Sequence, residues 1–280
     1  MKVLDTPTPQ GRAPEALHEP RYMSPSGIKA YLNCPAKYYY ERVLKVELPI
    51  SPALFIGSCV HEALASLHRS QMRGEPLSKD AVLAEYGSLF QSKLEDDNPV
   101  FTAKQTRQKV FETGSKLVDA YMESKLCADA RPNLGVEIHL EEEIIPGSPP
   151  LLGIIDLVKE GEGGQLVIAD IKTSAATPDM KTESWLNEVQ LVAYAVLMRK
   201  ALGKEVNQTE LWYLVKTANP KVLRHQLEPL SDTQLDRFKS IYQYVADGIE
   251  RQDFTPRPSF ACRMCDFRDR CQQWRGGLPV

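Results

Sequence analysis

The sequence contains no apolar run near the roughly 20 residues that a membrane-spanning helix requires. Its first 20 residues also lack the apolar core that a secretory signal carries. No G-x-x-x-x-G-K-[ST] motif occurs, which excludes a P-loop motor within this chain. These absences predict a cytoplasmic protein without membrane contacts and without a motor of its own.

Net charge is small as well, at -3 over 280 residues. A total this low does not mark a nucleic-acid-binding protein, so any such binding would depend on local basic patches. Hydrophobic residues make up 42% of the chain, which suffices for a sizeable core. The composition therefore indicates one large domain with elaborations, or a domain with a small additional lobe.

Cysteine is scarce, and six residues in a chain of this length are too few for a disulfide scaffold. Three of them form a C-x2-C-x5-C group: Cys262, Cys265 and Cys271. Grouped thiols in a reducing compartment more often bind metal, and a tetrahedral site requires a fourth ligand. Cys34 is the best candidate because the proline after it breaks a predicted helix and can present the thiolate outward. Zinc and an iron–sulfur cluster are both compatible with four thiolates, whereas Cys59 and Cys127 are predicted to be small core residues.

What the chain does contain is a pair of apolar segments around a glycine-rich turn. Residues 151–158 and 165–173 are rich in Ile, Leu and Val, and the turn is centred near Gly163. This pattern predicts a β-hairpin of two buried strands. Because side chains alternate along a strand, Asp170 and Lys172 share a face, and the turn places Asp156 opposite Asp170. Two carboxylates and an ammonium are therefore expected to form one patch in an apolar sheet.

This charged patch has two interpretations. A lone D-x-K, such as residues 170–172, usually marks a solvated strand end or an ion pair. Two carboxylates from adjacent strands can also hold a divalent cation, while a nearby lysine orients water or stabilises negative charge on a phosphate. The second arrangement is the chemistry of phosphodiester hydrolysis. Charges in an apolar sheet are costly unless they are paired or bound to a metal, which makes the patch a candidate functional site.

The rest of the chain is predicted to alternate between helices and strands. Four prolines and few apolar residues in segment 1–22 indicate a flexible arm, and Ser24 caps the first predicted helix. Further patterns predict a helix opening near Gly57, amphipathic helices at 78–94 and 102–127, a strand at 134–145, a helix at 185–203, strands at 208–217 and 221–230, and a helix at 231–251. Together these elements predict an α/β protein in which the helices at 78–127 serve as scaffold.

Three further side chains are weak signals when taken singly. A histidine such as His61, near the start of its predicted helix, is more often an ordinary core or surface residue. Beside two carboxylates, however, an imidazole would favour manganese. Gln190 and Tyr194 lie one helical turn apart on the same face, an arrangement that many helices have without any function.

The order of the motifs resembles that of a known family. Along the chain stand Cys34, G-x-x-x-H at 57–61, G-I-I-D at 153–156, D-I-K at 170–172, Q-x-x-x-Y at 190–194 and the terminal C-x2-C-x5-C. This order resembles the RecB-type branch of the PD-(D/E)xK nucleases, and more narrowly its iron–sulfur members. These include the nuclease domains of helicase–nucleases and the stand-alone nucleases associated with CRISPR adaptation. No proline precedes Asp156, a departure from the superfamily's name that this branch tolerates.

The resemblance implies a fold and a division of the chain. The fold would be an α/β restriction-endonuclease-like core, a central mixed sheet flanked by helices, with a helical insertion at about 72–130 and a C-terminal iron–sulfur clamp. The nuclease domain would span residues 23–257, after the arm at 1–22. The cysteine-rich tail at 258–280 would be closed by Cys34.

The resemblance also implies roles for individual residues. The ligands of a divalent cation, Mn2+ or Mg2+, would be His61, Asp156, Asp170 and the Ile171 carbonyl. Lys172 would position the attacking water, while Gln190 and Tyr194 would support the site and contact DNA. A [4Fe-4S] cluster, in place of zinc, would be held by Cys34, Cys262, Cys265 and Cys271.

The sequence therefore predicts a metal-dependent DNA nuclease, specifically an exonuclease on single-stranded DNA ends, in DNA repair, recombination or CRISPR-like DNA processing. A separate helicase, recombinase or integrase is the expected kind of protein partner. One competing hypothesis is a non-catalytic DNA-binding or assembly subunit with the same fold. Intact Asp156, Asp170 and Lys172 argue against it, because a decayed site would be expected to lose at least one of them. The other is a zinc-stapled binding protein, which analysis for iron and sulfide distinguishes.

Overall fold

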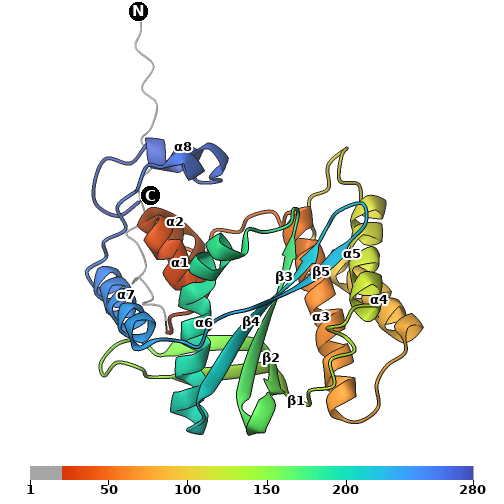
Figure 1. Cartoon of the computed structure of the whole chain (residues 1–280). Helices are drawn as coiled ribbons and strands as arrows, with labels where there is room; N and C mark the ends of the chain where they lie inside the picture. Colours follow the sequence, from red (N-terminus) through yellow and green to blue (C-terminus); the bar gives the residue numbers. More distant parts are fainter. Residues whose placement is uncertain (1–20, 280) are drawn as a thin grey trace, which may run out of the picture.

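One mixed β-sheet organises the structure, a computed structural model that describes residues 21–279 (Figure 1). Its strands are β1 (Asn133–Glu142), β2 (Leu151–Glu160), β3 (Leu166–Ser174), β4 (Val206–Val215) and β5 (Lys221–Gln226), and they lie in that order across the sheet. β3 and β4 run parallel, whereas the other neighbouring strands are antiparallel. The predicted hairpin is therefore present as β2 and β3, and the central mixed sheet of the expected fold is confirmed.

Helix α6 (Met180–Leu202) connects β3 to β4 and covers one face of the sheet (Figure 1). Parallel neighbours cannot be joined by a tight turn, so they require a crossover of this kind. Asp179 caps the start of the helix, and Gly203 ends it in a left-handed conformation with φ of 63°. On its inner face, Tyr194 packs against Ile155 of β2. The crossover thereby brings a helix that carries candidate site residues directly onto the hairpin.

Three helices cover the opposite face: α3 (Pro52–Met72), α4 (Lys79–Asp97) and α5 (Arg107–Met122) (Figure 1). α3 begins at Pro52, earlier than the predicted opening near Gly57. Ser51 caps it and proline occupies its first turn, which together are a stronger start signal than a glycine. Gly57 lies inside the helix, where an added Cβ would stand 3.3 Å from Thr173 Oγ1 of β3. The absent side chain lets α3 lie close to the sheet.

The two ends of the described chain pack together beside α6 (Figure 1). The N-terminal elements are α1 (Pro25–Asn33), α2 (Pro35–Tyr38) and a π-helical turn (Tyr39–Val43), and the C-terminal ones are α7 (Asp232–Glu250), a 3-10 turn (Phe260–Met264) and α8 (Arg268–Gln272). Tyr31 donates a hydrogen bond from its hydroxyl to Asp253 O at 2.7 Å, and Arg257 Nη1 donates to Leu32 O at 3.0 Å. These bonds join the two ends of the described chain. The expected arm at 1–22 lies almost entirely outside the described residues.

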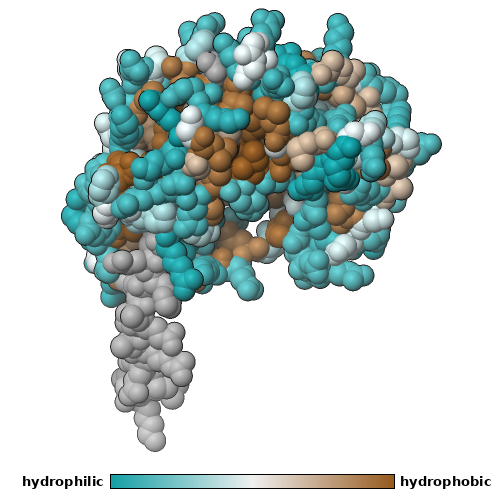
Figure 2. All heavy atoms as spheres, turned by 90° about the horizontal axis from the view of Figure 1, so that it is seen from below, coloured by the Kyte–Doolittle hydropathy of each residue, from teal (hydrophilic) through white to brown (hydrophobic). Residues whose placement is uncertain are grey.

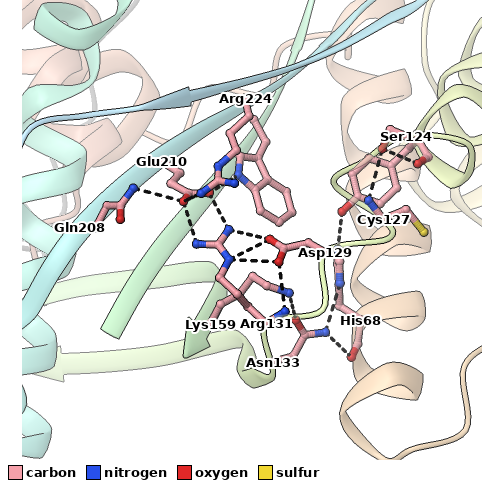
Figure 3. Close-up of polar contacts among 12 residues, drawn as sticks. His68, Ser124, Cys127, Asp129, Arg131, Asn133, Lys159, Gln208, Glu210 and Arg224 are labelled. Carbon is pink, nitrogen blue, oxygen red and sulfur yellow. Dashed lines mark hydrogen bonds and ion pairs between the residues drawn. The ribbon is translucent and has the colours of Figure 1, made fainter. Parts of the chain in front are cut away.

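A buried polar network joins the sheet to the lobe formed by α3, α4 and α5 (Figure 3). Glu210 on β4 is fully buried, and its carboxylate pairs with Arg131 at 2.9 Å and with Arg224 at 2.6 Å. The buried Lys159 ammonium on β2 donates to Asn133 Oδ1 at 2.6 Å, and the Asn133 amide donates to a backbone carbonyl of α3 at 3.2 Å. Because these charges have partners, the cost of burying them is offset.

Within residues 21–279, no helix is both long and apolar enough to cross a bilayer.

The face seen from below has hydrophobic residues near its centre and hydrophilic residues around them (Figure 2). Exposed apolar side chains on the sheet include Leu134 of β1 and Ile154 of β2. Such surface offers little to a polyanion, which is bound by clustered Lys and Arg side chains.

Candidate active site

The two hairpin carboxylates lie where β2 and β3 separate. Regular pairing between these strands ends at Leu157 and Ala169, and the next residues are Asp156 and Asp170. Beyond that point the backbone N–H of Ile171 donates to the Asp156 side chain of β2, at 2.7 Å from Oδ2. The two acids that the sequence places opposite each other therefore lie at the point where β2 and β3 separate.

Asp170 and Lys172 are held by a side chain from the crossover helix. Asp170 is only 1% exposed, and Lys172 Nζ lies 2.7 Å from its Oδ2. Gln190 Nε2 donates to Asp170 Oδ1 at 3.0 Å, and Gln190 Oε1 accepts from Lys172 Nζ at 2.9 Å. Gln190 Nε2 also donates to the Tyr194 hydroxyl at 2.7 Å. The structure thus brings the D-x-K and Q-x-x-x-Y residues into one hydrogen-bonded group.

One oxygen of the Asp170 carboxylate is poorly satisfied. Among the described residues, Asp170 Oδ2 is buried and accepts no hydrogen bond of good geometry, although Lys172 Nζ is within ion-pair distance. The Lys172 ammonium offsets the charge of this oxygen but leaves it lone pairs that no well-aligned donor occupies. Free carboxylate lone pairs of this kind suit a divalent cation, so the acid fits the role of a metal ligand.

His61 approaches the acids from α3, and its Nδ1 lies 3.7 Å from Asp156 Oδ2. Burial lowers the pKa of His61 to about 4, so at neutral pH its imidazole is uncharged and offers a lone pair. Burial, and then the neighbouring Asp170, raise the pKa of Asp156 well above its usual range. A neutral imidazole beside two repelling carboxylates is a donor set that a divalent cation would stabilise.

An open cavity of about 650 Å³ gives solvent access to this group. His61 and Asp156 line it together with Thr173, Arg69 and Lys216. A phosphodiester that enters the cavity would meet acids able to hold a cation, and basic side chains able to neutralise its own charge.

Glu137 of β1 lines the same cavity, and the sequence analysis does not single it out. Its φ of 50° is unusual for a residue with a side chain, and the ladder between β1 and β2 skips the pair that Glu137 would form with Asp156. Burial raises the pKa of its carboxyl group. No sequence signal identifies it, because it is one of four glutamates in the predicted strand at 134–145.

The cysteines expected to bind metal lie near one another, although they come from opposite ends of the described chain. Cys34 separates α1 from α2, and the other three lie in or beside the C-terminal turns. Burial, and then the neighbouring Cys34, Cys265 and Cys262, raise the pKa of Cys271. Backbone N–H groups point at two of the sulfurs: Arg257 N donates to Cys34 Sγ at 3.5 Å, and Ser259 N donates to Cys262 Sγ at 3.3 Å.

The two remaining cysteines occupy apolar positions. Cys59 is fully buried in the core beneath α3, and Cys127 is partly buried against the same core. Among the described residues, no two cysteines form a disulfide.

Two groups of candidate ligands have been described: the carboxylates with His61, and the four cysteines. Within residues 21–279, no three His, Cys, Asp or Glu side chains are arranged as the ligands of a metal ion.

Comparisons with known proteins give one family. The model of the PD-(D/E)XK nuclease superfamily matches residues 22–272. The crystal structure of a protein from Eubacterium rectale, provisionally described as an exonuclease, is similar to this one with a TM-score of 0.60 at 17% identity, over 94% of this chain and 91% of that chain. The crystal structure of SSO0001 gives a TM-score of 0.38 at 16% identity, over 85% and 92% of the two chains. A search of curated proteins found no match.

Proposed function

This chain belongs to the PD-(D/E)XK nuclease superfamily, and on that basis we propose that it is a divalent-metal-dependent deoxyribonuclease that digests single-stranded DNA from its ends. One observation carries the proposal. The buried Asp170 lies beside Asp156, whose pKa it raises, and Asp156 and His61 line an open cavity with 3.7 Å between His61 Nδ1 and Asp156 Oδ2. The provisional description of the E. rectale protein of the same fold as an exonuclease supports the same reaction class.

We assign a divalent cation to His61, Asp156, Asp170 and the Ile171 carbonyl. Oxygen ligands suit both Mg2+ and Mn2+, and the imidazole favours Mn2+. When bound, such a cation lowers the pKa of a water molecule and neutralises negative charge that develops on a phosphate.

The neighbouring side chains have separate tasks in this proposal. The Lys172 ammonium, fixed between Asp170 and Gln190, holds the attacking water and favours its deprotonated form. Gln190 keeps the acid and the lysine in their relative positions, and Tyr194 orients Gln190. We also assign DNA contacts to Gln190 and Tyr194, as the family resemblance implies.

We further assign the chain to the RecB-type branch and to DNA repair, recombination or CRISPR-like DNA processing. A helicase, recombinase or integrase is the kind of partner that we assign to it, and these 280 residues contain no Walker motif. A non-catalytic DNA-binding subunit is the weaker alternative, because its site would not need an intact Asp156, Asp170 and Lys172.

The test of this function is digestion of single-stranded DNA labelled at either end. With Mn2+, we expect the purified protein to release short labelled products from one end before the other end shortens. The matched reaction with EDTA should leave the strand intact, and a duplex of the same sequence should be digested more slowly. Internal cuts without loss from an end would contradict the exonuclease assignment, and no digestion of any DNA would contradict the nuclease.

We propose a [4Fe-4S] cluster on Cys34, Cys262, Cys265 and Cys271. The proximity of the four thiols and the N–H groups aimed at two of the sulfurs support this assignment, since N–H donors stabilise thiolates that ligate a metal. Four thiolates would also suit zinc, so the metal must be identified chemically.

Iron analysis separates these alternatives. Protein purified without oxygen is expected to be brown and to contain about four iron atoms and four acid-labile sulfides per chain, as the cluster formula requires. Cys34→Ser should lower both contents sharply, whereas Cys127→Ser, at a half-buried cysteine outside the group, should not. Stoichiometric zinc with no labile sulfide would overturn the cluster assignment.

A further inference from the structure

A second cavity, of about 380 Å³, adjoins the candidate active site. The two cavities share Ala53 and Lys216 as lining residues, so they lie side by side. The second cavity is basic: its lining includes Lys104, Lys109, Lys116 and Lys216 against a single acid, Glu112. The whole chain, in contrast, has a net charge of -3, so this excess of lysine is local.

The lysines come from separate parts of the fold. Lys109 and Lys116 are two helical turns apart on α5, and Thr113 lies between them on the same face of the cavity. Lys104 precedes α5, and Lys216 directly follows β4, where its Nζ donates to Thr173 Oγ1 at 3.5 Å. The cavity therefore lies between the helical lobe and the end of the sheet that carries the candidate site.

These lysines are not used in ion pairs. In the described part of the chain, none of the four lies within ion-pair distance of a carboxylate, whereas Lys79 of α4 pairs with Asp119 at 2.5 Å and Lys93 pairs with Glu62 at 3.0 Å. Burial also lowers the pKa of Lys216. The other three lysines are exposed, so all four ammonium groups repel one another across the hollow and remain available to an anion that enters it.

Another hollow on the molecule provides a contrast. It lies between α6 and α7, and its lining includes Arg199, Lys200 and Lys239. There Arg199 pairs with Glu205 at 2.9 Å, and Lys239 pairs with Asp236 at 3.4 Å. It shares no lining residue with the candidate active site. The hollow beside α5 therefore differs from this one in two ways: its lysines form no ion pairs, and it adjoins the candidate active site.

We infer that this cavity binds the phosphates of a single DNA strand and guides the strand past Lys216 to the candidate active site. The inference rests on the proposed nuclease function and gives the α4–α5 insertion a role in substrate binding. A cavity of this volume holds a drug-sized ligand. It can therefore accommodate a short stretch of a single strand, whereas a duplex is too wide to enter it. Lysines contact phosphates without reading bases, so the binding is independent of sequence.

The test is DNA binding in EDTA, where the strand stays intact whether or not the protein is a nuclease. Fluorescence anisotropy of a labelled oligothymidylate of about 16 nucleotides is measured as salt rises from about 50 to about 200 mM. The variant is Lys109→Gln with Lys116→Gln, on exposed positions of α5. Its control is Lys200→Gln with Lys239→Gln, which removes the same charge from the other basic hollow.

We expect the α5 variant to bind about tenfold more weakly than wild type at about 100 mM salt. Each phosphate contact to a single strand contributes about 0.7 to the slope of log K against log salt, so two lost contacts should lower the slope by about 1.4. The control variant should stay within about twofold of wild type, and both variants should melt at the wild-type temperature. An unchanged slope in a folded α5 variant would overturn the inference, as would an equal loss for duplex and single-stranded DNA.

The binding measurement and the digestion assay can fail independently of each other. If wild type binds the strand through α5 but digests no DNA with Mn2+, the nuclease assignment fails and the binding surface stands. If wild type digests DNA and the α5 variant binds it normally, the binding surface is wrong and the nuclease assignment stands.

Discussion

Asp170→Asn and Lys172→Ala are each expected to reduce Mn2+-dependent hydrolysis of single-stranded DNA by about a thousandfold or more. The first change removes the charge of the most deeply buried acid in the candidate site. The second removes the ammonium that lies 2.7 Å from that acid and 2.9 Å from Gln190 Oε1. Initial rates on end-labelled DNA, at saturating Mn2+, measure both losses.

Lys172→Ala leaves the buried Asp170 carboxylate without its ammonium partner and should lower the melting temperature, whereas Asp170→Asn should not. An asparagine at position 170 can still accept the hydrogen bond that Gln190 Nε2 donates, and it no longer repels Asp156. We therefore expect Asp170→Asn to melt at or above the wild-type temperature. Asp236→Asn is the matched control, because that aspartate is 75% exposed on α7 and should leave the rate unchanged. Full activity in both site variants would show that this hairpin is not where the reaction occurs.

Glu210→Ala is expected to lower the free energy of unfolding by about 3–5 kcal/mol, a large fraction of the stability of a typical domain. Glu210 is fully buried and accepts from Arg131, Arg224 and, at 2.7 Å, the Trp212 indole (Figure 3). Burial alone would raise its pKa, but the hydrogen bonds from these partners lower it, so the group is ionised at neutral pH. Truncation would leave Arg131 and Arg224 without their shared carboxylate.

Glu205→Ala supplies the matched comparison for that loss. Glu205 also pairs with an arginine, Arg199, at 2.9 Å, but the side chains of Glu205 and Arg199 are each 64% exposed. An exposed pair of this kind typically contributes about 0–1 kcal/mol. Urea unfolding of the two variants, followed by circular dichroism, measures the difference. Equal midpoints would mean that the buried network contributes no more than a surface ion pair.

The hairpin could be predicted because local rules determine it. A glycine-rich turn between two apolar runs defines the pairing, and the period of two along a strand then places Asp156 opposite Asp170. The helix with Gln190 and Tyr194 follows from its own spacing and from the glycine that ends it. The family resemblance connected these local predictions to a nuclease.

Long-range contacts could not be predicted in the same way. Glu210 and Arg131 are 79 residues apart, and nothing in either neighbourhood marks one as the partner of the other. The left-handed backbone of Glu137 depends on how β1 meets β2 and has no counterpart in the alternation of polar and apolar residues. The lysines of α5 look like an ordinary solvated helix face until the fold places them beside β3 and β4.

The parallel pairing of β3 with β4 has a consequence for how the protein is made. On a ribosome, β3 is synthesised before the crossover helix, and its second neighbour begins only at Val206. Until then one edge of β3 is unpaired. The first six residues of this strand are all buried in the finished fold, and all of them except Asp170 are apolar. Such an edge favours association between unfinished chains. Synthesis that stalls between Ser174 and Val206 should therefore yield aggregated fragments, and the hairpin acids acquire Gln190 and Tyr194 only once that interval has been translated.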